Sequence, residues 1–91
     1  MPLFMMICRD KPDHLALRLE TRGAHLAYIA DTGVVAQAGP LLDEVGQMTG
    51  SLIILDVPDM DAARHWGGND PYFQAGLFES VTVEQWKKVV G

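Results

Sequence analysis

The chain has 91 residues, enough for one domain with a thin core, because a domain of this size buries only about 60–65% of the surface of its unfolded chain. Apolar residues make up 48% of the sequence, which excludes a disordered or fibrous protein. The net charge of −5, with no basic cluster longer than Lys87-Lys88, argues against nucleic acid as a partner.

The amino-terminal run from Leu3 to Cys8 is continuously apolar, which predicts a central strand buried on both faces. It is far shorter than the ~20 residues that cross a bilayer, and no basic leader or cleavage site accompanies it. We therefore expect neither export nor membrane insertion. Cys8 is the single cysteine and cannot form an internal disulfide, so we expect a buried, inert thiol and a cytoplasmic protein.

A long helix is predicted from about residue 12 to 31, with Pro12 in its first turn and Gly33 as its left-handed cap. Arg22 falls within its apolar arc, His25 and Arg18 fall at the edge, and Arg18 is expected at the surface near a pocket mouth. A buried charge costs several kcal/mol unless it is paired, so an arginine in the arc needs an acidic or a ligand partner. The arc, expected to pack on the sheet, contains Leu15, Leu19, Leu26, Ile29 and Ala30.

The rest of the chain alternates short apolar runs with turn residues, and Asp70 is expected to be extended because Pro71 follows it. The predicted elements are a strand from Val34 to Ala38 stopped by Gly39-Pro40, a connection from Leu41 to Thr49, a strand from Gly50 to Val57, a helix from Met60 to Trp66 stopped by Gly67-Gly68, a turn from Asn69 to Tyr72, a strand from Gly76 to Val83, and a short tail from Gln85 to Val90.

The order β-α-β-β-α-β predicts a single ferredoxin-like α+β domain over residues 1–91, with a four-stranded antiparallel sheet and two helices on one face. The other sheet face is left bare, although the strands from Leu3 to Cys8 and from Gly50 to Val57 are apolar on both sides. A second copy of the chain is the simplest cover, so we expect a homodimer whose sheets face each other, with higher oligomers left open.

Five short motifs in order and spacing resemble the YCII-related, or YciI-like, family of dimeric α+β barrel proteins over nearly the whole chain. This resemblance implies a ferredoxin-like protomer, a dimer, and a pocket in which His25 and Asp70 form a catalytic dyad. Related barrel proteins include isomerases, cofactor-independent monooxygenases and dehalogenating lyases. The motifs are Arg22 with His25-Leu26, Gly39-Pro40-Leu41, Gly50-Ser51, Asp70-Pro71-Tyr72 with Ala75-Gly76-Leu77, and Gln85-Trp86-Lys87-Lys88.

His25 and Asp70 are the candidate catalytic residues. An imidazole, with a usual pKa near ~6.5, can act as a general base, and a carboxylate can fix its tautomer. The alternative is a structural histidine beside an Asp-Pro turn that caps local amides. Arg22 either binds a substrate anion or pairs with an acid such as Asp70.

Ser51 and Tyr72 are the other candidate substrate-binding residues. Ser51 could offer a hydroxyl to a ligand, although strand packing is the favoured interpretation, and Tyr72 either walls an aromatic-sized pocket or fills the core. His14 and His65 have no second ligand at metal spacing, and no phosphate-binding glycine loop is present, so we expect no metal and no cofactor.

Two functions fit this sequence. The first is a cofactor-independent small-molecule enzyme, a lyase or isomerase that transfers a proton on a small cyclic or aromatic acid through His25. The second is a non-catalytic module that binds a metabolite or serves as a dimeric interaction platform.

Overall fold

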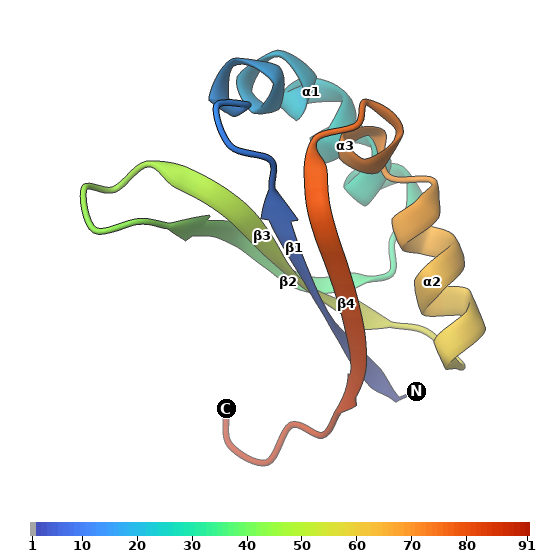
Figure 1. Cartoon of the computed structure of the whole chain (residues 1–91). Coiled ribbons are helices and arrows are strands. Elements are labelled where there is room, and N and C mark those ends of the chain that lie inside the picture. Colours follow the sequence, from blue (N-terminus) through green and yellow to red (C-terminus); the bar gives the residue numbers. More distant parts are fainter. Residues whose placement is uncertain (1) are drawn as a thin grey trace.

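A computed structural model describes residues 2–91, which fold into one antiparallel sheet with the strand order β2-β3-β1-β4. Figure 1 shows the helices on one side of this sheet and the β2–β3 hairpin reaching beyond it. The predicted ferredoxin-like α+β fold is therefore confirmed. The elements are β1 (Leu3–Asp10), α1 (Leu15–Thr32), β2 (Val35–Leu42), β3 (Met48–Asp56), α2 (Met60–Gly68), α3 (Pro71–Gln74) and β4 (Phe78–Trp86).

Strand β2 continues through Gly39 and Pro40, so the predicted stop at this dipeptide is wrong. Pro40 lies opposite Ser51 of β3. Because β2 is an edge strand, proline can be accommodated where its missing N–H would not join the ladder. The predicted connection from Leu41 to Thr49 is correspondingly too long, since only a tight turn joins the two strands. In this turn the Asp43 carboxylate accepts hydrogen bonds from the backbone N–H groups of Val45 and Gln47.

The helix boundaries also differ from those predicted. Helix α1 begins at Leu15 and ends with Gly33 in the expected left-handed conformation, at φ 64°. Helix α2 runs through the glycines that were expected to stop it. A Cβ on Gly67 would lie 2.8 Å from the Met6 methyl carbon, so this glycine lets α2 approach β1 closely. Asp70 is extended as predicted, but the residues after it form the one-turn helix α3.

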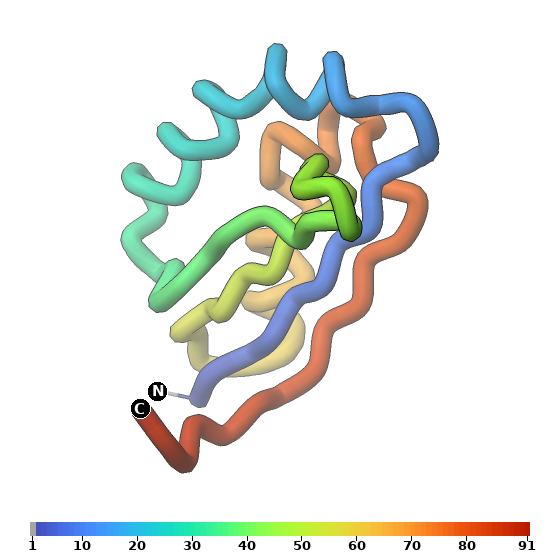
Figure 2. Tube along the Cα trace, turned by 90° about the vertical axis from the view of Figure 1, so that its left-hand side faces the viewer, coloured from blue at the N-terminus to red at the C-terminus, as the bar shows by residue number. Residues whose placement is uncertain are grey.

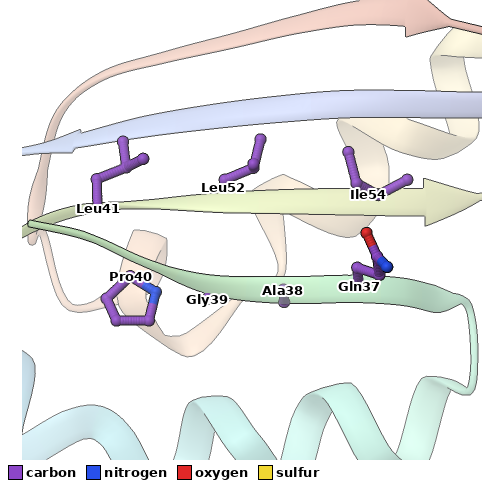
Figure 3. A pocket seen from close by; sticks show the side chains of 7 residues that line it. All are labelled: Gln37, Ala38, Gly39, Pro40, Leu41, Leu52 and Ile54. Carbon is purple, nitrogen blue, oxygen red and sulfur yellow. The ribbon is translucent and has the colours of Figure 1, made fainter. Parts of the chain in front are cut away.

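The core lies between the sheet and the helices. In β1, Phe4, Met6 and Cys8 are buried there, which confirms the buried thiol. The opposite sheet face presents Leu41, Leu52 and Ile54, which Figure 3 shows in a row along β2 and β3. No helix of residues 2–91 is long and apolar enough to cross a membrane.

Candidate active site

The buried face of α1 is polar at its centre. Arg18 and His25, two helical turns apart, are its buried residues, whereas Leu19 is 55% and Leu26 is 44% exposed. The prediction that the apolar arc packs on the sheet is therefore wrong at these two positions and at Ala30, which is also exposed. The predicted surface position of Arg18 is also wrong, and Arg22 is exposed. Specific polar partners decide which face of this helix is buried.

His25 contacts Asp70 directly within one protomer. Its Nδ1 lies 2.8 Å from Asp70 Oδ1, His25 is 6% exposed and Asp70 is fully buried. An ionised carboxylate can only accept a hydrogen bond, so a neutral imidazole that bonds to it through Nδ1 would donate from Nδ1 and keep its lone pair on Nε2. The fold thus brings together the two residues predicted as a base and its orienting group.

Asp70 is held by the start of α3. Its Oδ1 also accepts the backbone N–H of Tyr72 at 3.0 Å, which makes it the N-cap, with Pro71 in the first turn. The extended backbone imposed by Pro71 supports this geometry. Asp70 Oδ2 is buried and has no hydrogen-bond partner among residues 2–91. A buried oxygen without a partner is costly. The hydrogen bond that joins His25 to the other oxygen, Oδ1, therefore matters for keeping this carboxylate buried.

The Tyr72 ring lies between the two buried α1 side chains. The His25 imidazole stacks on it with ring centroids 4.0 Å apart and an interplanar angle of 19°. The Arg18 guanidinium carbon lies 4.6 Å from the same ring centroid. Since the imidazole covers one face, the guanidinium lies over the other. Tyr72 therefore offers a ligand only its edge and hydroxyl group, and burial raises the pKa of this hydroxyl so that it stays neutral, despite the opposing effect of Arg18 and Arg22.

Arg18 is anchored by a buried ion pair. Its Nε and Nη2 donate to the two carboxylate oxygens of Asp10, at 2.6 and 2.8 Å, and Nη2 also donates to Ser51 Oγ at 2.9 Å. Burial lowers the pKa of Arg18, but the hydrogen bond and the charge of Asp10 more than offset this, and the net shift is upward. The predicted buried arginine with an acidic partner exists, but at Arg18 rather than Arg22.

A cavity of about 160 Å³ opens between α1, β2, β3 and α3. Figure 2 shows α1 and β2 next to each other along one edge of the sheet. His25, Arg22, Ser51 and Tyr72 all line the cavity, whereas Asp70 lies behind His25. The other lining residues are Arg18, Leu26, Ile29, Ala38, Gly39, Pro40, Met48 and Ile53. The sequence pattern predicted no role for Arg18 at the site. The signal that could have indicated one is Asp10, a charged residue at the end of the first strand that requires a basic partner.

Known proteins resemble this chain at the level of both sequence and structure. Residues 2–87 match the YCII-related domain. Protein YciI of Escherichia coli O6:H1 is 38% identical, over 96% of this chain and 98% of its own length. The structure of 5-chloro-2-hydroxyhydroquinone dehydrochlorinase from Burkholderia phenoliruptrix AC1100, in complex with 2,5-dihydroxybenzoquinone, has a TM-score of 0.84 and 35% identity, over 93% of each chain.

A more distant likeness concerns the fold alone. An antibiotic biosynthesis monooxygenase has a TM-score of 0.62 and 12% identity, over 99% of this chain and 100% of its own. The fold is thus one that small-molecule enzymes use. The resemblance seen in the sequence motifs is confirmed by the domain match and by the YciI relative, and the chain belongs to the YCII-related family.

Proposed function

We propose that the protein is a cofactor-independent enzyme that transfers a proton on a small cyclic or aromatic acid, in an elimination or isomerisation. The observation that carries this proposal is the 2.8 Å contact between His25 Nδ1 and Asp70 Oδ1, with His25 in the wall of the cavity. This leaves Nε2 as the nitrogen that takes the substrate proton. Asp70 orients the ring and stabilises the imidazolium that forms, and such a base typically contributes 10²–10⁴ in rate.

The other proposed residues bind the substrate. Arg22 is exposed at the cavity and supplies a positive charge for an anionic group. Ser51 provides a hydroxyl group, and Tyr72 provides the edge of its ring. Together they suit a ligand that carries oxygen atoms on a compact ring.

The cavity volume supports a monocyclic substrate. A cavity of about 150 Å³ holds a benzene-sized molecule, and this one measures about 160 Å³. The 35% identical dehydrochlorinase was solved with 2,5-dihydroxybenzoquinone, a six-membered ring that carries four oxygens. We therefore propose oxygenated six-membered rings as the substrate class, with the loss of HCl from a chlorinated member as a reaction to test.

The test begins with 5-chloro-2-hydroxyhydroquinone and a panel of small cyclic acids. Chloride release and quinone absorbance would be measured for wild type, His25→Ala and Asp70→Asn, with His65→Ala as a histidine control outside the cavity. We expect turnover that falls at least 100-fold in His25→Ala and is unchanged in His65→Ala. Full turnover in His25→Ala would refute the mechanism. A panel with neither binding nor turnover would favour the non-catalytic module.

We also propose that the bare sheet face joins two copies of the chain into a homodimer. Leu41, Leu52 and Ile54 form an apolar row on it, and an apolar face of this kind is stabilised when a partner covers it. Light scattering should give a particle of twice the 10.0 kDa chain mass, and Leu52→Glu should shift it toward the monomer. A monomeric wild type at micromolar concentration would contradict this proposal.

A further inference from the structure

The residues after β4 form a tail without secondary structure, and this tail carries two neighbouring apolar side chains into solvent. Val89 is 82% and Val90 is 88% exposed, and Trp86, the last residue of β4, is 38% exposed. Figure 1 shows the tail bending away from α2 as it leaves the sheet. Exposed apolar residues that gather in one place indicate a surface that a partner covers.

The hairpin between β2 and β3 carries a second exposed apolar group. At its turn, Leu42 is 59% and Val45 is 82% exposed. Figure 1 shows the hairpin reaching beyond the sheet. On the bare sheet face the apolar surface continues from the turn as a groove along Leu41, Leu52 and Ile54 (Figure 3). We call these five residues the hairpin surface.

The charges beside the two apolar groups are opposite in sign. The tail carries Lys87 and Lys88 and no acidic residue, whereas the turn carries Asp43 and Glu44 and no basic residue. All four side chains are exposed, and within residues 2–91 none of them forms an ion pair. Opposite charges at the rim of an apolar contact guide association and fix its register. The tail and the hairpin surface are therefore complementary in both polarity and charge.

The tail cannot meet the turn of its own chain. Trp86 lies opposite Leu3 at one end of the sheet, and Leu3 lies opposite Asp56, the last residue of β3. The turn lies beyond the other end of β3, a strand of nine residues that spans about 27 Å. Val90 follows Trp86 by four residues and can reach at most about 14 Å from it. A contact between these surfaces therefore requires a second chain.

We infer that the tail of one protomer packs on the hairpin surface of its partner in the homodimer. This inference rests on the homodimer given under the proposed function, in which two bare sheet faces meet, and not on the proposed reaction. A two-fold axis that runs across the strands, between the two sheets, places the tail end of one sheet over the hairpin end of the other. Symmetry then forms the same contact twice. The two valines pack on the apolar hairpin surface, and the two lysines lie near the acidic turn.

The first test is the dissociation constant of the dimer, measured by sedimentation equilibrium over a series of protein concentrations. We expect Val89→Ser/Val90→Ser to raise this Kd at least 100-fold, because four valine side chains in each dimer lose their apolar contact. Leu19→Ser is the matched control. Leu19 is 55% exposed on α1, on the side of the sheet that the helices cover, so this variant should keep the wild-type Kd.

The second test reverses the charges. Lys87→Glu/Lys88→Glu should raise the dimer Kd about 10-fold, because repulsion replaces attraction at both contacts. Adding Glu44→Lys should restore at least 3-fold of this loss. Asp43 is left unchanged, because its carboxylate accepts two backbone N–H groups in the turn. Adding Glu20→Lys instead is the control for net charge, since Glu20 is exposed on α1, and it should restore nothing.

Three results would overturn the tail contact: an unchanged dimer Kd in Val89→Ser/Val90→Ser, an equal recovery with Glu20→Lys and with Glu44→Lys, and a wild type that is monomeric. The first two leave the homodimer itself standing, because the sheet faces alone would then hold it, and Leu52→Glu tests those faces separately. Full turnover in His25→Ala would refute the proposed reaction and bears on neither surface. The hypotheses are therefore separable.

Discussion

The ion pair between Asp10 and Arg18 gives a sharp stability prediction. Both side chains are nearly inaccessible, at 7% and 3%, and the pair has two hydrogen bonds. Removing one partner of a buried pair typically costs about 3–5 kcal/mol, because the other charge stays buried and uncompensated. We expect Asp10→Asn to lower the free energy of unfolding by this amount. For a domain of 60–100 residues, that corresponds to a fall in Tm of roughly 12–40 °C.

The measurement is urea unfolding followed by the fluorescence of the two tryptophans, Trp66 and Trp86, at fixed protein concentration. Asp13→Asn is the matched control, since Asp13 is an exposed carboxylate with φ 61°, a conformation that asparagine tolerates. The double variant Asp10→Asn/Arg18→Met should be more stable than Asp10→Asn alone, because it removes the unpaired charge. A loss below about 1 kcal/mol in Asp10→Asn, the size expected of an exposed pair, would refute this reasoning.

Three further predictions concern single positions. Burial raises the pKa of the Cys8 thiol from 9.0 to about 12, so the unfolded chain loses this proton at lower pH than the folded chain. The free energy of unfolding should therefore fall as pH rises from 9 toward 12. An equal fall in Cys8→Ala would contradict this prediction. Gly50→Ala should destabilise the protein by about 1–3 kcal/mol, since its Cβ would overlap the Cys8 carbonyl oxygen, whereas Gly39→Ala, where the space is open, should have little effect on urea unfolding. Asp59→Ala should cost about 1 kcal/mol in the same assay, because Asp59 caps α2 through the backbone N–H of Ala62, and an unchanged unfolding midpoint would exclude that role.

The sequence predicted the fold well because its signals were local. The apolar run of β1, the cap at Gly33 and the extended Asp70 before Pro71 each follow from a few neighbouring residues. The stop at Gly39-Pro40 was wrong because it depends on whether the strand lies at an edge of the sheet. The stop at Gly67 was wrong because a glycine in a helix can serve close packing instead, here against Met6.

The candidate site was predictable in its members and less so in its geometry. His25 and Asp70 were singled out by chemistry and by family motifs, and the fold brings them to 2.8 Å. The exchange of Arg18 and Arg22 was not predictable from helical periodicity, which counts apolar residues and cannot see partners. Asp10 and Ser51, from two different strands, satisfy Arg18 and thereby decide which arginine is buried.

The most direct test of the proposed mechanism is the protonation pattern of the His25 ring, measured by ¹⁵N NMR on the neutral imidazole and assigned with His25→Gln. We predict a protonated Nδ1 that donates to Asp70 and an unprotonated Nε2 available to the substrate, with His14 and His65 as internal references. A ring protonated at Nε2 would contradict the proposal, because no lone pair would then face the cavity.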